Sequence, residues 1–133
     1  MAKKTKGRGP YESRFDYSKM KNTFVEVELE TGETVKATLA YICLLELRNA
    51  READYKRYTK IVMKGMEDGG ELDMLVVIYT GYLCALIAEG GIGEDAMDYE
   101  EFISCMSPDR EYLGEVFALL TNPKKAKASE TDS

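Results

Sequence analysis

Hydrophobic and polar residues alternate strictly along the stretch TFVEVELETGETVKA. Val25, Val27 and Leu29 fall on one side of an extended chain, and every position between them is a glutamate. This alternation is typical of a strand with one buried face. A Thr-Gly pair then indicates a turn, and a second polar-apolar alternation follows it. The pattern therefore predicts a β-hairpin over residues 23–38.

The length of the hairpin loop decides which side chains share a face. A two-residue loop would pair Leu29 with Thr34 and would mix apolar and polar side chains. A three-residue loop over residues 31–33 would pair Leu29 with Val35 and would keep the apolar face intact. We therefore predict the three-residue loop. An isolated hairpin is marginally stable in water, so we expect this one to pack against helices.

Helical patterns follow the hairpin and complete one domain over residues 23–122. The predicted helices span residues 39–64, 71–89, 99–106 and 108–121. The helix over 71–89 is apolar nearly all round, which predicts burial on several sides. We expect an α+β fold that is mainly α-helical, with an N-terminal β-hairpin followed by about four helices.

Local signals refine these helices. Thr38 is placed to cap the first helix, and Ser107 to cap the last, with Pro108 at its first helical position. Gly81 lies inside the apolar helix, where glycine costs about 1 kcal/mol relative to alanine. The simplest explanation is that another helix approaches closely at this point.

The first helix carries a candidate protein-binding stripe. Apolar and tyrosine side chains gather on one side of the helix, and Arg48, Arg51 and Glu52 interrupt that side. Either the helix bends near Asn49, or this turn faces another chain. The residues of the predicted interface are Leu44, Leu47, Arg48, Arg51, Tyr55, Tyr58 and Val62.

Charge is distributed unevenly along the chain, whose net charge is −6. The first 22 residues carry seven Lys/Arg and two acids, whereas residues 65–109 carry eleven acids and no base. We predict a basic flexible arm over 1–22 and a disordered polar tail over 123–133. The arm permits nucleic-acid binding, but the acidic folded part disfavours it. Self-association, with Arg48, Arg51, Arg57 and Lys60 facing the acidic half of another copy, is also open.

The residue types disfavour catalysis and bound cofactors. The chain has no histidine, the commonest general base and metal ligand. Its three cysteines are widely spaced among apolar residues, which predicts buried thiols in a reducing cytoplasm. The longest apolar run has fifteen residues, from Met74 to Ala88, against the roughly 17–25 of a membrane span. We predict no enzyme activity, cofactor, metal or membrane anchor.

One loop has a partial likeness to a calcium site. If Glu101 were the final bidentate ligand of a twelve-residue calcium loop, the loop would start at Gly90 and its third position would be Ile92. Two of the three leading ligands would then be missing. We therefore interpret Asp98 as a helix N-cap that forms a capping box with Glu101.

The order of these parts resembles the tail assembly chaperones of long-tailed bacteriophages and prophages of Gram-positive bacteria. A polar strand pair precedes a charged helix that ends in VMKG, and the apolar helix MLVVIYTGYLCA follows. A short helix YEEF comes next, and the helix SPDREYLGEVFALL runs into NPKK. The similarity covers roughly Thr23 to Lys125, and the basic arm departs from the family pattern.

The resemblance implies a non-enzymatic protein in the cytoplasm of the bacterial host. Members of this family are thought to coat the phage tape measure protein and to help tail tube protein polymerise around it. The family often makes a longer product by ribosomal frameshifting, and the Pro-Lys-Lys of NPKK can be encoded by a slippery run of adenines.

Overall fold

The protein is an α+β structure that is mainly α-helical, as predicted. The computed structural model describes residues 11–13, 24–64 and 70–122. The strands are β1 (Tyr11–Glu12), β2 (Val25–Glu28), β3 (Thr34–Ala37) and β4 (Gly91–Ile92). The helices are α1 (Tyr41–Ala50), α2 (Glu52–Met63), α3 (Glu71–Ala88), α4 (Tyr99–Cys105) and α5 (Arg110–Thr121).

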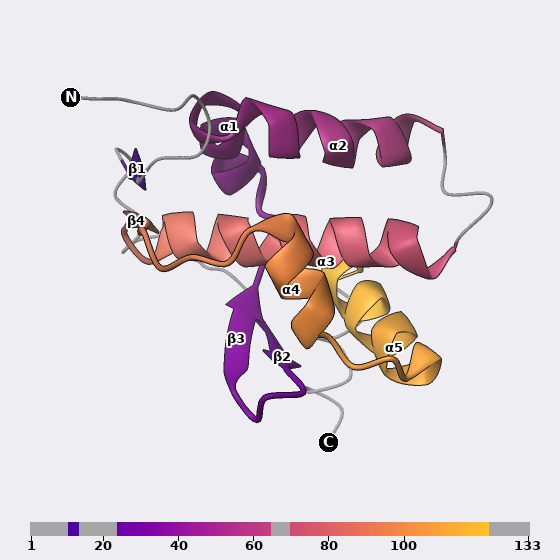
Figure 1. Ribbon diagram of the computed structural model, residues 1–133. Helices are drawn as coiled ribbons and strands as arrows, with labels where there is room; N and C mark the ends of the chain where they lie inside the picture. Colours follow the sequence, from indigo (N-terminus) through magenta and orange to yellow (C-terminus); the bar gives the residue numbers. More distant parts are fainter. Residues whose placement is uncertain (1–10, 14–23, 65–69, 123–133) are drawn as a thin grey trace, which may run out of the picture.

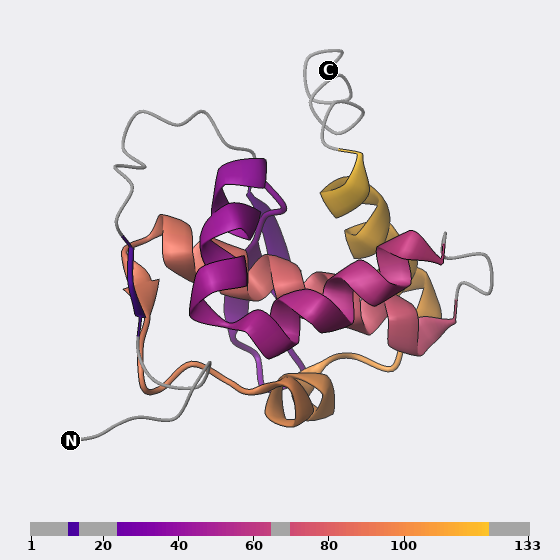
Figure 2. The same ribbon diagram turned by 90° about the horizontal axis from the view of Figure 1, so that it is seen from above.

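Helix α3 forms the centre of the molecule. Helices α1 and α2 cover one side of it, and the β2–β3 hairpin, α4 and α5 lie toward the other side (Figures 1 and 2). By length and composition α3 could cross a membrane, but 67% of it is buried inside the protein. The predicted burial of this helix on several sides is therefore confirmed, and its burial is that of a core helix.

The hairpin has a three-residue loop that begins one residue earlier than predicted. The Leu29 N–H donates to the Glu33 carbonyl at 2.8 Å, so the loop spans residues 30–32 instead of 31–33. Gly32 has a φ of +96°, as the last position of such a loop requires. The strand pairing shifts by two positions relative to the prediction, because Val35 lies opposite Val27 instead of Leu29. Because side chains alternate along a strand, the apolar face stays intact.

The predicted single helix over residues 39–64 is two helices. Arg51 has φ −139° and ψ 71°, which interrupts the helical backbone between α1 and α2. Of the two alternatives that the sequence left open, this agrees with a bend near Asn49. The hydrophobic pattern alone did not reveal that the bend separates two helices.

The predicted caps of the first and last helices are wrong. Ala40 precedes α1 and makes no side-chain cap, while the Thr38 N–H donates to the Gly81 carbonyl at 3.0 Å. The last helix begins at Arg110, and the Asp109 carboxylate accepts the N–H of Glu111 at 3.0 Å. Both predicted cap residues lie in the preceding connections, because the chain turns later than the pattern suggested.

Close packing of β3 and α5 against α3 explains the glycine at position 81. A methyl group at this position would lie 3.1 Å from Ala37 Cβ and 3.3 Å from Leu120 Cδ2. The expected close approach of a helix is therefore present, through Leu120 of α5. Ala37 of β3 approaches even more closely, so the missing side chain makes room for both.

Part of the predicted arm is ordered. Tyr11 lies opposite Ile92 in the antiparallel pairing of β1 with β4, and the Ser13 N–H donates to the Gly90 carbonyl at 2.9 Å. A strand of two residues has no periodicity, so the sequence could not reveal it. The rest of the arm and the tail over 123–133 lie outside the described residues.

Gly91→Ala should detach β1, because Gly91 has a φ of +146° and a methyl group there would overlap the Tyr11 carbonyl oxygen. The matched control is Gly90→Ala, which carries a similar backbone strain at φ +131° but has nothing within 4 Å. We expect the control to lose about 1–3 kcal/mol of stability and to keep slow amide exchange at Ser13. Gly91→Ala should lose more stability, and its Ser13 amide should exchange fast. Equal exchange of the Ser13 amide in both variants would contradict the pairing of β1 with β4.

Candidate protein interface

The predicted interface stripe does not form one accessible surface. Leu47 is 0% exposed in the core, and Arg51 is 6% exposed at the junction of α1 and α2. Arg48 is exposed to solvent. The bend at the junction turns the two halves of the stripe relative to each other. Leu47 and Arg51 are therefore corrected to structural residues that no partner can reach in this structure.

Four other predicted residues of the stripe keep at least part of their surface exposed, and so does Tyr41 at the start of α1. Tyr55, Tyr58 and Val62 recur at helical spacing along α2, and Leu44 lies one turn after Tyr41 on α1. Tyr41 is 90% exposed and Val62 is 49% exposed, while the other three are half-buried. We refer to Tyr41, Leu44, Tyr55, Tyr58 and Val62 as the tyrosine face.

The electrostatics of Tyr58 show that the tyrosines lie near one another. Burial is the main cause that raises the pKa of Tyr58, and the nearby Cys84 thiol and the phenols of Tyr55 and Tyr41 raise it further. The Tyr58 hydroxyl is therefore protonated at neutral pH. Tyrosine combines an apolar ring with a polar hydroxyl, and this combination suits protein contacts.

Other large apolar side chains are exposed at the far end of the helical layers. Met63 at the end of α2 is 84% exposed, and Leu72 at the start of α3 is 66% exposed. An ion pair of 3.3 Å between Lys64 and Asp73 holds these two helix ends together. Sequence reasoning missed both side chains: Met63 lies off the stripe, and Leu72 belongs to a helix that was expected to be buried.

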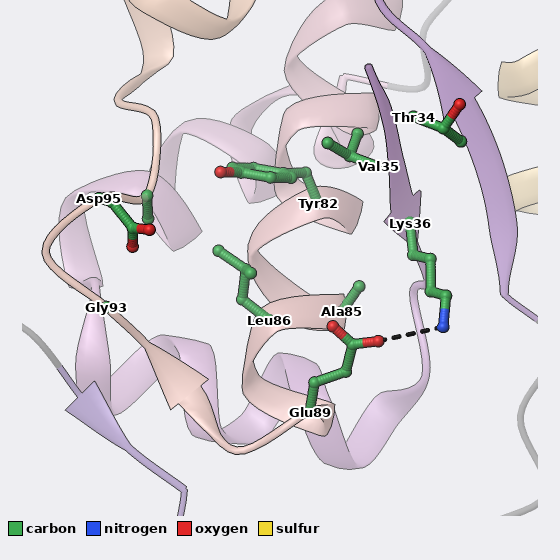
Figure 3. A pocket seen from close by; sticks show the side chains of 10 residues that line it. Thr34, Val35, Lys36, Tyr82, Ala85, Leu86, Glu89, Gly93 and Asp95 are labelled. Carbon is green, nitrogen blue, oxygen red and sulfur yellow. Dashed lines mark hydrogen bonds and ion pairs between the residues drawn. The ribbon is translucent and has the colours of Figure 1, made fainter.

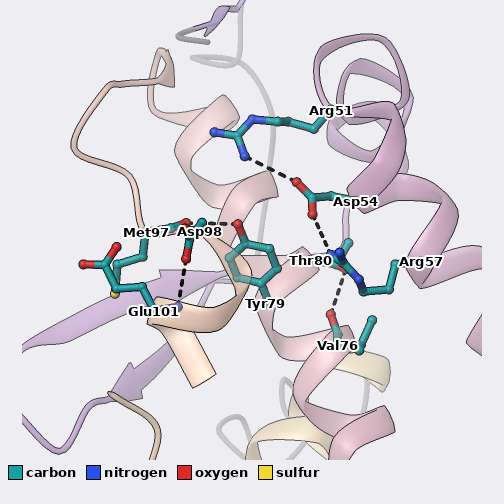
Figure 4. A network of polar contacts seen from close by, with 9 residues as sticks. All are labelled: Arg51, Asp54, Arg57, Val76, Tyr79, Thr80, Met97, Asp98 and Glu101. Atoms are coloured by element: carbon teal, nitrogen blue, oxygen red, sulfur yellow. Dashed lines mark hydrogen bonds and ion pairs between the residues drawn. The ribbon is translucent and has the colours of Figure 1, made fainter. Parts of the chain in front are cut away.

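A partly buried polar network lies at the bend between α1 and α2 (Figure 4). The two oxygens of the Asp54 carboxylate accept hydrogen bonds from Arg51 at 3.3 Å and from Arg57 at 2.7 Å. Arg57 also stacks on the ring of Tyr99, 4.3 Å from its centroid. The ion pair with Asp54 compensates the burial of the Arg51 guanidinium, whose Nε has no hydrogen-bond partner among the described residues.

The connection before α4 is held by two tyrosine hydroxyls of α3. The Tyr79 hydroxyl donates to the Met97 carbonyl at 3.0 Å, and the Met97 N–H donates to the Tyr82 hydroxyl at 3.0 Å. Burial, and then the Asp54 carboxylate, raise the pKa of Tyr79 far above its usual value. Its hydroxyl therefore stays protonated and acts as a structural donor.

The loop with a partial likeness to a calcium site caps a helix. The Asp98 carboxylate accepts the N–H of Glu101 at 2.8 Å, which confirms the predicted N-cap. Within residues 11–13, 24–64 and 70–122, no group of three His, Cys, Asp or Glu side chains could hold a metal ion. Burial raises the pKa of the Cys84 thiol well above its usual value, so this thiol is a poor nucleophile.

Comparison of the chain with protein-family models, with curated proteins and with solved structures found no match. Membership of the tail assembly chaperone family therefore stays a prediction from the order of elements in the sequence. What the structure adds is a surface: the tyrosine face on α1 and α2, with further exposed apolar side chains on the neighbouring helix ends.

Proposed function

We propose that the protein is a non-enzymatic phage tail assembly chaperone that binds the tape measure protein and assists assembly of the tail tube. The observation that carries this proposal is the exposure of large apolar side chains on the helices. Tyr41 and Met63 are 90% and 84% exposed, and Val62 and Leu72 are 49% and 66% exposed. Grouped exposed apolar side chains mark protein interaction sites.

The character of this surface suits a temporary contact with a long helical client. The tyrosine face combines the exposed ring of Tyr41 on α1 with the half-buried rings of Tyr55 and Tyr58 on α2, so each contact is moderate in strength. A chaperone must also release its client, and many moderate contacts permit this better than one deep pocket. An amphipathic client helix would lay its apolar side across such a face.

Charge supports the same role. Residues 65–109 contain eleven acids and no base. Surface carboxylates would keep a complex with an apolar client in solution, because like-charged particles repel one another.

Exposure favours some of the basic residues for self-association over others. Arg51 is buried, and Arg57 already pairs with Asp54 although its side chain is 39% exposed. Arg48 and Lys60 remain exposed on α1 and α2. A contact between copies through basic side chains would therefore use Arg48 and Lys60. This attraction between charges would be stronger at low salt.

The test is co-expression with the tape measure protein, followed by measurement of the fraction of that protein that stays soluble. Wild-type protein should keep the client soluble and co-purify with it. The double variant Tyr41→Asp/Val62→Asp should weaken binding by roughly tenfold or more, because central interface side chains contribute about 2 kcal/mol or more each. Both side chains are exposed enough to be replaced without disturbing the core.

The matched control is Ala53→Asp/Ser104→Asp, which adds the same two charges at exposed positions outside the tyrosine face. This control should bind the client as wild type does. Failure of the wild-type protein to rescue the client would contradict the proposed function. Equal loss of binding in both double variants would show that the tyrosine face is not the binding surface.

A further inference from the structure

The backbone of β3 has an outer edge whose direction the hairpin fixes. Leu29 and Glu33 form a hydrogen-bonded pair at the loop, and such pairs alternate along an antiparallel ladder. Val27 and Val35 therefore bond to each other, whereas the main-chain groups of Thr34 and Lys36 point away from β2.

Two observed bonds agree with this alternation. Glu28 lies opposite Thr34, and its N–H leaves the hairpin to donate to the Tyr112 hydroxyl at 2.7 Å. On the β3 side, the Thr38 N–H leaves the hairpin for the Gly81 carbonyl at 3.0 Å. Even-numbered residues of both strands thus direct their main-chain groups outward.

The two edges of the hairpin differ in how they are covered. On the β2 side, the Tyr112 hydroxyl of α5 accepts a hydrogen bond from the Glu28 N–H, and the Cys105 carbonyl accepts one from the Glu30 N–H at 2.8 Å. In the described part of the chain, no main-chain bond from another segment reaches Thr34 or Lys36. Among the described residues, the edge of β3 is therefore open at Thr34 and Lys36, whereas that of β2 is covered at Glu28 and Glu30.

The open edge borders a hollow of about 310 Å³ (Figure 3). Tyr82, Ala85 and Leu86 of α3 line it together with Val35, and Ala96 adds to the apolar surface. A volume of about 300 Å³ lies at the lower end of the range for ligand sites. The hollow can therefore take one apolar side chain next to a strand edge.

The charged groups around the hollow indicate the partner. Glu89 and Asp95 bring two carboxylates to it, and Lys36 is its one basic side chain. Lys36 contacts Glu89 at 3.2 Å, and both side chains are 49% exposed. An exposed ion pair contributes little and is readily exchanged, so a basic ligand group can replace Lys36 beside Glu89.

We propose that the β3 edge binds an extended segment of a partner protein in which apolar and basic residues alternate. The segment adds a third strand by bonding to the main chain of Thr34 and Lys36. An apolar side chain enters the hollow over Tyr82 and Leu86, and basic side chains meet Glu89 and Asp95. This surface is distinct from the tyrosine face, and the proposal does not depend on the chaperone function.

The experiment uses the full chain and a blocked synthetic heptapeptide of alternating lysine and valine. Titration followed by amide NMR should perturb Thr34, Lys36, Tyr82 and Glu89, and binding should saturate. The same peptide with glutamate in place of lysine should bind at least tenfold more weakly, because it meets two carboxylates.

A matched pair of variants separates strand addition from charge contact. Lys36→Pro removes the outward N–H and leaves the ladder intact, since proline is tolerated at such edge positions, and it should weaken binding at least tenfold. Lys36→Ala keeps the N–H and should bind at least as well as wild type. If Lys36→Pro fails to fold, Glu89→Lys/Asp95→Lys provides the test, because it should reverse the preference between the two peptides.

Three results would overturn the proposal. They are saturable binding that perturbs only residues away from β3, no binding of the lysine-valine peptide, and equal weakening by Lys36→Ala and Lys36→Pro. Perturbation of the same amides by protein concentration alone would assign the edge to a second copy instead of a partner. If the Lys36→Pro variant still keeps the client soluble in the co-expression test, the tyrosine face and the β3 edge are separate binding sites.

Discussion

Asp54→Ala is expected to destabilise the protein by about 3 kcal/mol, in the range for removal of one partner from a buried ion pair. The Arg51 side chain is 8% exposed and the Asp54 side chain is 13% exposed. Without the carboxylate, two guanidinium groups face each other near the α1–α2 junction with no anion between them. The variant should unfold at a lower urea concentration, and the junction should show faster amide exchange.

The matched control is Glu52→Ala, which removes a carboxylate from the same helix. Glu52 pairs with Lys56 at 3.4 Å, but both side chains are more than half exposed, at 66% and 71%. Exposed pairs of this kind contribute about 0–1 kcal/mol. Losses of equal size in Asp54→Ala and Glu52→Ala would show that the network does not hold the bend.

The elements that the sequence predicts well are those with a sustained period. The glutamate alternation in β2 and the apolar run of α3 give the correct type of element, because each follows from one repeated burial environment. The ends of helices and the hairpin loop are displaced by one or two residues. Such boundaries depend on single hydrogen bonds, such as that of Thr38 with Gly81, which residue types alone do not determine.

The candidate interface was predictable only in part. Tyr55, Tyr58 and Val62 lie on one face because they share a helix. Leu47 and Arg51 are buried near the α1–α2 junction, where the Arg51 guanidinium pairs with Asp54. A charged residue on an apolar stripe can mark either a partner contact or a buried ion pair, and only the position of Asp54 separates the two. The β3 edge lacked any signal, since it consists of main-chain groups.

The second large effect is expected for Phe102→Ala, which should cost about 3–5 kcal/mol, as is usual for a buried phenylalanine. Phe102 is 0% exposed and anchors α4, a helix of seven residues. Its ring lies 5.3 Å from that of Tyr79 and 5.1 Å from that of Tyr82, measured between centroids. Loss of the ring leaves a cavity between α3 and α4 and removes both aromatic contacts.

Near-ultraviolet circular dichroism offers a specific readout of this cluster. The protein has no tryptophan, so tyrosine and phenylalanine packing dominates the signal, and Phe102→Ala should reduce it at temperatures well below the unfolding transition. Ile103→Ala is the matched control, since Ile103 is the next residue of α4 and is only half-buried. It should lose less stability, about 1 kcal/mol, and keep the aromatic signal. If Ile103→Ala matched Phe102→Ala in both measurements, α4 would be held along its length instead of by one ring.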